Sequence, residues 1–297
     1  MKFKGHETFF IRKGWLSKGM KNINTNPILF VDKNNNPMDE LGLGSNMVKS
    51  LRYWLLATGL TIEEISKEDK KRHQKLTDGF GQIIFNNDRF LEETGTLHLI
   101  QYKLASNKKD ATSWYFFFNK FNMNEFTKED FIIEMNKYLA DEKETVPATS
   151  SIAYDFTCII NTYLSRAKTQ QKEIDSENNI DCPLGELGLV DVVNRKKGIY
   201  KKTIPLAATF NPWIVMAVIS DNAKNQQEIN LNELLIGENN IGKIFNLDSV
   251  AMLEVLHTVE KSGMIKIIRT AGLDVIQIKK MYSFSECIEN YFKEIAS

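Results

Sequence analysis

The alternation of apolar, polar and glycine positions between residues 39 and 60 predicts two helices joined by a tight turn. Gly42 and Gly44 mark the turn, because glycine takes up backbone conformations that other residues avoid. Ser45 suits the N-cap of the second helix, and Gly59 suits the position just beyond its end. This order of elements is typical of a helix-turn-helix, whose second helix can enter the major groove of DNA.

The second of these helices separates its side chains onto two faces when successive residues are placed about 100° apart. The side expected to pack against the preceding helices carries Met47, Val48, Leu51, Trp54 and Leu55. The opposite, polar side carries Asn46, Lys49, Ser50 and Tyr53, with Arg52 at its flank. Lysine and arginine reach phosphate or guanine, and asparagine binds adenine, so this side is predicted to contact DNA. The alternative is an ordinary amphipathic helix whose outer face is only solvated.

Cations and turn-forming residues follow this helix. Lys70, Lys71 and Arg72 form a basic turn, and residues 76–85 continue with threonine and glycine into an apolar run. The order resembles the end of a winged-helix domain, where a hairpin gives way to the next helix. We therefore expect Lys71 and Arg72 to lie on DNA phosphates, a contact that positions a protein without reading sequence.

Residues 88–166 have a mainly helical pattern, and the polar stretch 167–180 is typical of a surface linker. The aromatic run 114–121 offers a platform on which unpaired bases can stack, but such a run is more often core, and core is the favoured interpretation.

The last third repeats the order of helix and hairpin. A helix that enters near Asp248 and ends at Gly263 precedes two strand-like runs, 264–269 and 274–279. The outer side of that helix mixes acidic and basic residues, which favours packing against protein over reading DNA.

The predicted fold class is mainly α with small β-hairpins. An N-terminal winged helix-turn-helix is expected over 1–87, a helical domain over 88–180, and a C-terminal winged-helix-like domain over 181–297. A chain of 297 residues is long for one core, which agrees with two or three domains.

The formal net charge of zero gives the chain no overall attraction to DNA or membranes, so any such contact needs a local patch. The first 21 residues supply one candidate patch, although charge runs are often only a solvated surface. Its cations, opposed only by Glu7, are Lys2, Lys4, Arg12, Lys13, Lys18 and Lys21. Three unevenly spaced cysteines fit thiols in a reducing cytosol, and no apolar run approaches the roughly 20 residues of a membrane span. A cytoplasmic protein is expected.

Candidate catalytic chemistry is sparse. His6 and Glu7 are adjacent, which suggests an acid–base or metal pair, but no second histidine stands at ligand spacing and a structural loop role is favoured. Cys182 is expected to be buried and inert, because the acidic neighbours Asp181 and Glu186 raise the pKa of a thiol. The sequence therefore predicts no enzyme, no cofactor and no metal site, with a nuclease or sulfur-handling enzyme kept as the least favoured alternative.

Several motifs together resemble one bacterial family of unknown function, number four thousand and seven (DUF4007). They are Gly-His-Glu-Thr-Phe at 5–9, the block 41–55, Cys-Pro-Leu at 182–184 with 186–189, residues 245–248, and Thr-Ala-Gly-Leu at 270–273. Ser45 stands where the family leads us to expect lysine, which removes one phosphate contact.

The resemblance implies a place beside sulfurtransferase-like enzymes in DNA phosphorothioation and phage-defence clusters. The predicted function is a DNA-binding accessory or regulatory protein of such a system. Its expected partners are double-stranded DNA, plain or modified, and sulfurtransferase-like or other defence proteins. The alternative is a non-enzymatic assembly subunit that binds a modification enzyme through its winged helices.

Overall fold

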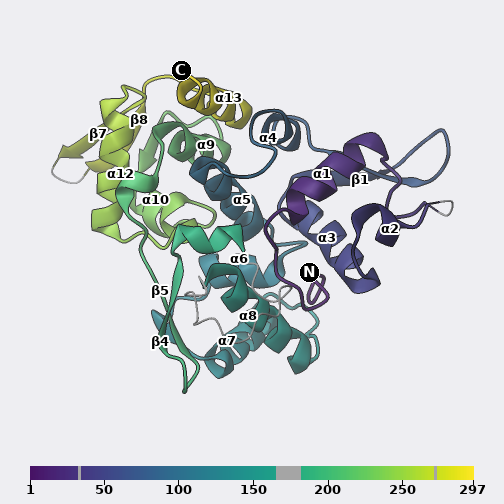
Figure 1. Cartoon of the computed structure of the whole chain (residues 1–297). Coiled ribbons are helices and arrows are strands. Elements are labelled where there is room, and N and C mark those ends of the chain that lie inside the picture. Colours follow the sequence, from purple (N-terminus) through teal and green to yellow (C-terminus); the bar gives the residue numbers. More distant parts are fainter. Residues whose placement is uncertain (33–34, 165–181, 271–272) are drawn as a thin grey trace, which may run out of the picture.

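The computed structural model of the chain describes residues 1–32, 35–164, 182–270 and 273–297 (Figure 1). The predicted linker at 167–180 and the turn at Ala271 and Gly272 lie outside the described residues. The first third contains α1 (Trp15–Thr25), α2 (Pro37–Leu41), α3 (Ser45–Ala57), β1 (Thr61–Ile65), β2 (Arg72–Leu76) and α4 (Gly81–Asn87).

The middle of the chain is mainly helical, as its pattern predicts. It contains α5 (Thr94–Ser106), α6 (Thr112–Asn119), the short strand β3 (Glu125–Phe126), α7 (Lys128–Asp141) and α8 (Thr149–Tyr163).

The last third mixes short helices with strands. It begins with η1 (Pro183–Leu187), β4 (Val190–Asn194), β5 (Ile199–Lys202), η2 (Ala207–Thr209) and α9 (Pro212–Asn222). It continues with β6 (Glu228–Asn230), α10 (Leu231–Ile236), α11 (Ile241–Ile244), α12 (Ser249–Lys261), β7 (Ile265–Thr270), β8 (Leu273–Ile278) and α13 (Phe284–Ile295).

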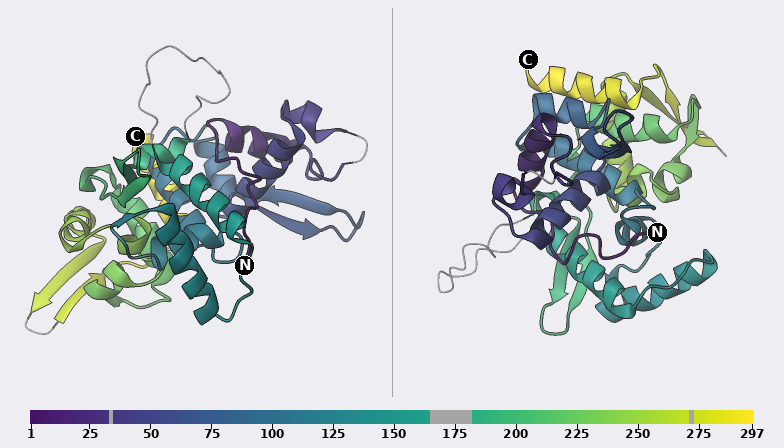
Figure 2. Two further views of the ribbon diagram at one scale, coloured as in Figure 1. Left: turned by 90° about the horizontal axis from the view of Figure 1, so that it is seen from below. Right: turned by 90° about the vertical axis from the view of Figure 1, so that its right-hand side faces the viewer.

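The described strands form three small antiparallel sheets. β1 pairs with β2, β3 joins the edge of the β4–β5 hairpin, and β6 joins the β7–β8 hairpin in the order β6-β8-β7. Seen from below, the β1–β2 and β7–β8 hairpins project from opposite ends of the body (Figure 2).

These sheets make the predicted fold class wrong. The chain is a mixed α/β protein in which helices and three sheets share the structure, and it is not built from two winged-helix domains with a helical middle. The sequence pattern missed the β4–β5 hairpin. It also missed β3 and β6, because strands of two or three residues are too short to show a period and form only by pairing with partners far along the chain.

The aromatic run of α6 lies in the hydrophobic core, which confirms the favoured interpretation. Every residue of this helix is buried, and its rings pack against others from α7 and β3, for example Phe117 against Phe126 at 5.4 Å between centroids. The alternative of a base-stacking platform would need an exposed ring face, and these rings expose almost none.

Helix α5 lies at the centre of the molecule (Figure 1). Ten of its 13 residues are buried, and it contacts α6, η1, α9 and α11. Gln101 links it to two neighbours: its amide donates to the carbonyl oxygen of Ile244 at 3.0 Å, and its side-chain oxygen accepts from the hydroxyl of Tyr163. A helix buried on nearly all sides needs polar residues whose partners come from other elements.

His98 lies within this buried helix. Its ring stacks on Phe210 at 4.4 Å and meets Phe245 edge-on at 5.3 Å. Burial lowers the pKa of His98 from 6.5 to about 4, because the charged imidazolium loses its water.

This shift predicts how stability depends on pH. Between pH 6.5 and about 4 the unfolded chain protonates His98 while the folded chain does not, so the free energy of unfolding falls as the pH drops. The loss is about 3 kcal/mol. A His98→Leu variant should show a flatter stability profile in this window when urea denaturation is followed at several pH values. His257→Leu, at an exposed position, is the control and should keep the wild-type slope. An unchanged slope in His98→Leu would contradict this assignment.

Candidate nucleic-acid interface

The turn between α2 and α3 is built as the glycine pattern predicts. Asn36 caps α2 by accepting from the backbone N–H of Met38 at 3.1 Å, and Gly42 ends it with φ at 59°, a left-handed conformation that favours glycine. Helix α3 begins at Ser45, with Gly44 as its N-cap, so the prediction that Ser45 is the N-cap is wrong by one position. Gly59 follows the helix with φ at 70°, as predicted.

Two of the residues predicted to face DNA lie on the exposed edge of α3. Asn46 and Lys49 are exposed, and the Lys49 ammonium is 3.5 Å from the Asn46 side-chain oxygen. Arg52, one turn after Lys49, is half-buried and donates to Glu63 of β1 at 2.5 Å. Arg52 therefore joins α3 to strand β1.

The other two, Ser50 and Tyr53, are buried, so the prediction that they lie on the outer face is wrong. The hydroxyl of Ser50 donates to the carbonyl oxygen of Phe9 at 3.3 Å, and Tyr53 is only 5% exposed. The N-terminal segment covers this face: Trp54 also donates to Phe9 at 2.9 Å, and a Cβ on Gly5 would stand 2.5 Å from the Tyr53 ring. The helical pattern did not reveal this because the covering segment is an irregular loop without a period of its own.

The β1–β2 hairpin extends the exposed edge of α3. Its turn places Lys71 and Arg72 at the surface, and Arg72 lies 3.7 Å from Glu63, which also holds Arg52. The hairpin's cations are Lys67, Lys70, Lys71, Arg72 and Lys75, and its anions are Glu63, Glu64, Glu68 and Asp69. It is therefore nearly neutral as a whole, and the exposed positive charge without an ion pair is concentrated in the lysines of its turn.

His6 takes part in a buried network and not in an exposed site. Its Nδ1 accepts from the backbone N–H of Thr8 at 3.1 Å, so its Nε2 carries the proton and donates to Asp155 at 2.8 Å. Asp155 also accepts from the backbone N–H of Lys4 at 2.8 Å and from the hydroxyl of Ser113 at 2.6 Å. The three donors come from the N-terminal segment and α6, and the acceptor comes from α8.

A serine, a histidine and an aspartate thus meet, but not as a hydrolytic triad. The Ser113 hydroxyl donates to Asp155 and not to His6, so no base is placed to remove its proton. All three side chains are at most 2% exposed, which leaves no room for a substrate. The structural role favoured for His6 is confirmed. Its neighbour Glu7 lies in a turn with φ at 49°, outside this network.

Cys182 is buried, as predicted, directly before η1. Within the described ranges, no three His, Cys, Asp or Glu side chains gather closely enough to share a metal ion. Among the described helices, none is both long and apolar enough to cross a lipid bilayer.

The sequence of this chain matches a known protein family. The model of a family described as "Protein of unknown function (DUF4007)" matches residues 3–292. The chain belongs to this family. The family resemblance drawn from the motifs is thereby confirmed. No curated protein sequence matches the chain.

Two solved structures share the fold over the full chain. The "Magnesium ion-bound SspB crystal structure" matches with a TM-score of 0.84 and 24% identity, covering 100% of this chain and 89% of that one. The "SspB crystal structure" matches with the same TM-score and identity, covering 99% of this chain and 87% of that one. The match extends over the whole chain, so the protein shares the mixed α/β fold of SspB. This finding also contradicts the predicted winged-helix architecture.

The Asp155 network yields a stability prediction. An Asp155→Asn substitution keeps the shape but replaces one acceptor oxygen with an NH₂ group, so at least one of the three buried donors loses its partner. We expect a loss of about 3 kcal/mol in the free energy of unfolding, measured by urea denaturation. Asp191→Asn, where the carboxylate is exposed and 3.8 Å from Lys201, is the control and should change stability by less than about 0.5 kcal/mol. Equal stabilities of wild type and Asp155→Asn would show that the network does not hold the N-terminal segment.

Proposed function

We propose that this protein is a DNA-binding accessory subunit of a bacterial DNA-modification or defence system, and that duplex DNA lies along the exposed edge of α3 and the turn of the β1–β2 hairpin. The observation that carries the proposal is the continuity of this surface. Arg52 and Glu63 join helix and hairpin through a 2.5 Å ion pair, so Asn46 and Lys49 on the helix and Lys71 on the turn belong to one edge of the molecule.

The chemistry of this edge suits phosphate contact. Lys49, Lys67 and Lys71 are exposed and have no carboxylate within ion-pair distance among the described residues. Lysines of this kind position a duplex through its backbone, and Asn46 is the residue there that is able to read a base edge. Arg52 and Arg72 are less suited, because Glu63 already binds both.

The role within a modification system rests on the family and its structural relatives. The family resemblance implies a neighbourhood of phosphorothioation and phage-defence genes, and the fold shared with SspB over the whole chain supports the same kind of accessory role. The proposed protein partners are sulfurtransferase-like or other defence proteins of that system.

One of the two SspB structures is described as magnesium-bound. Among the described residues of this chain, no three acidic, histidine or cysteine side chains converge as a set of metal ligands. At the proposed interface Glu63 and Glu64 point to opposite faces of β1, and each is paired with a cation. The proposed DNA contact is made by lysine side chains.

A second function is favoured by a different observation on the same hairpin. Ile62 is 43% exposed and Ile65 is 69% exposed, and the hairpin as a whole is nearly neutral. Exposed apolar side chains on a projecting hairpin suit a protein partner better than a phosphate backbone. In this alternative the protein is an assembly subunit that binds a modification enzyme through the β1–β2 hairpin.

A charge-reversal experiment separates the two functions. Binding of matched plain and phosphorothioate duplexes is followed by fluorescence anisotropy across a salt series. For a DNA-binding protein, Lys49→Glu with Lys71→Glu should weaken binding at least about tenfold and reduce the salt slope by about two, because two phosphate contacts no longer release counterions. A preference for the sulfur-bearing duplex would add a sensor role.

The control is Lys137→Glu with Lys293→Glu, the same charge change at exposed positions on α7 and α13. Equal weakening in both double variants would mean that only net charge matters and would discard α3 as the contact. If wild type binds neither duplex at low salt, the assembly alternative takes its place, and Ile62→Ser with Ile65→Ser should then abolish co-purification of the partner enzyme. Strand breaks appearing in the DNA when magnesium is added would make the protein an enzyme.

A further inference from the structure

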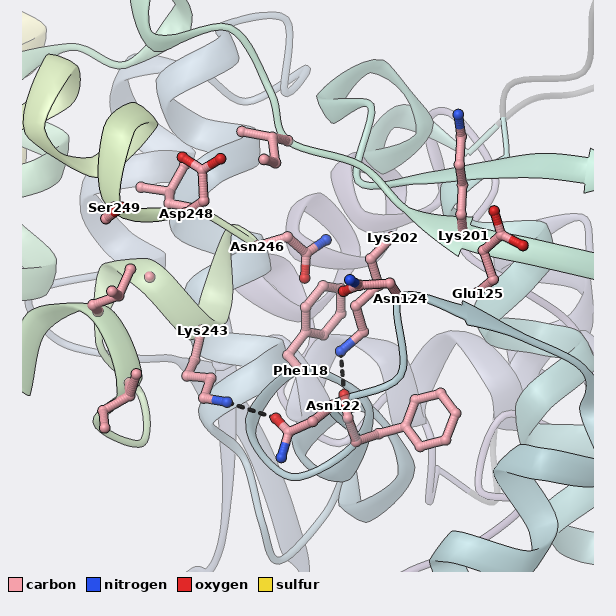
Figure 3. Close-up of a pocket in the computed structure, with 16 residues that line it drawn as sticks. Phe118, Asn122, Asn124, Glu125, Lys201, Lys202, Lys243, Asn246, Asp248 and Ser249 are labelled. Atoms are coloured by element: carbon pink, nitrogen blue, oxygen red, sulfur yellow. Dashed lines mark hydrogen bonds between the residues drawn. The ribbon is translucent and has the colours of Figure 1, made fainter. Parts of the chain in front are cut away.

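A cavity of about 620 Å³ lies where the end of α6, the end of β5, helix α11 and the loop between α11 and α12 meet (Figure 3). It is far from α3 in the sequence, and none of its lining residues belongs to the proposed DNA interface. Its size falls within the range of small-molecule sites. Figure 3 shows the side chains of Lys202 and Lys243 extending from two different walls toward the loop at Asn122.

Lys202 is held in place by the end of a helix. Its ammonium donates to the carbonyl oxygens of Phe117 at 2.6 Å and Phe121 at 2.5 Å, where α6 ends and its last carbonyls lack helical partners. Two of its three protons are used in this way, and one remains. Burial, and after it the nearby charge of Lys243, lowers the pKa of Lys202 to about 7.

Lys243 approaches from α11. Its ammonium donates to the side-chain oxygen of Asn122 at 2.7 Å, which leaves two protons for another acceptor. Its pKa is lowered, first by burial and then by the charge of Lys120. Glu238 opposes this effect, but its carboxylate is already bound by Lys120 and by the hydroxyl of Tyr115.

The two ammonium groups therefore share a cavity without a counter-ion of their own. Among the described residues, neither has a carboxylate within 4.0 Å. The acidic groups that line the cavity are engaged or remote: Asp248 caps α12 by accepting from the N–H of Ala251, and Glu125 stands beside Lys201 on the far side (Figure 3). Two like charges that each keep unused protons in one cavity are most stable when an anion binds between them.

The rest of the lining suits an organic group attached to that anion. Ile204 is 47% exposed and Ile236 is 57% exposed at the wall of the cavity, so both offer uncovered apolar surface. The side chains of Asn124 and Asn246 lie near Lys202 in the same cavity (Figure 3). The NH₂ group of Asn246 donates to the carbonyl oxygens of Leu189 and Thr203, so its side-chain oxygen is left to accept a hydrogen bond.

We infer that this cavity binds a nucleoside phosphate, with the phosphate between Lys202 and Lys243 and the base against Ile204 and Ile236. The amides of Asn124 and Asn246 meet the polar edge of the base. The ligand is either a free nucleotide or the phosphorylated end of a DNA strand, since both present the same group. The site is independent of the α3 edge, so either can fail without the other.

The test uses the full chain and isothermal titration with adenosine monophosphate and with inorganic phosphate. Wild type should bind the nucleotide, and Lys243→Gln should weaken that binding about tenfold or more by removing a charge-assisted hydrogen bond. Ile204→Glu, which places a carboxylate on the apolar wall at an exposed position, should weaken it as well. Lys137→Gln is the matched control and should leave the affinity unchanged. Thermal unfolding shows that each variant is folded, and Lys202 is left intact because it also caps α6.

A second pair of probes distinguishes the two sources of the ligand. A short single-stranded oligonucleotide with and without a 5′-phosphate is titrated into the Lys49→Glu, Lys71→Glu background, so that the contribution of the α3 edge is reduced. Tighter binding of the phosphorylated oligonucleotide than of the mononucleotide would assign the site to a strand end, and the reverse order would assign it to a free nucleotide. Absence of nucleotide binding at millimolar concentration would overturn the inference. So would equal affinities of wild type and Lys243→Gln, or inorganic phosphate binding as tightly as the nucleotide.

Discussion

One buried carboxylate organises the part of the molecule on which the DNA proposal depends. Asp155 accepts hydrogen bonds from Lys4, His6 and Ser113, so it fixes the N-terminal segment against α6 and α8. A buried carboxylate is tolerable only when its oxygens are fully used, which makes the arrangement specific. The segment held in this way covers one face of α3 and leaves its other edge, next to β1, exposed.

The same principle recurs across the molecule. Polar side chains join elements that the sequence separates widely: Gln101 joins α5 to α8 and α11, and Lys202 joins β5 to the end of α6. Burial of apolar surface stabilises the packing of these elements but does not favour one orientation over another. The polar contacts determine how the elements are oriented relative to one another. The lysine cavity follows from this selection, because α11 and β5 bring their charges together only after both have docked on α6.

The features that were predicted correctly from the sequence are those that depend on residues close together in the chain. The turn at Gly42, the end of α3 at Gly59 and the burial of the aromatic run of α6 all depend on residues close to one another, and they are found as expected. Ser50 and Tyr53 were misplaced because an irregular segment from elsewhere covers them. The third strand of each larger sheet, and the pairing of Lys202 with Lys243, depend on tertiary contacts that no period reveals. The family itself was recognisable because its motifs extend along the whole chain.

The network at Asp155 also has a consequence for how the chain acquires its structure during synthesis. Its acceptor lies 149 residues after His6 and 151 after Lys4. At translation rates of roughly 5–20 residues per second, the N-terminal segment leaves the ribosome on the order of ten seconds before its partner exists. Throughout that interval Lys4 and His6 lack their carboxylate acceptor, and the N-terminal segment is held only by its contacts with α3. Docking of the N-terminal segment on α8 therefore waits for a contact of long range, and such contacts form slowly.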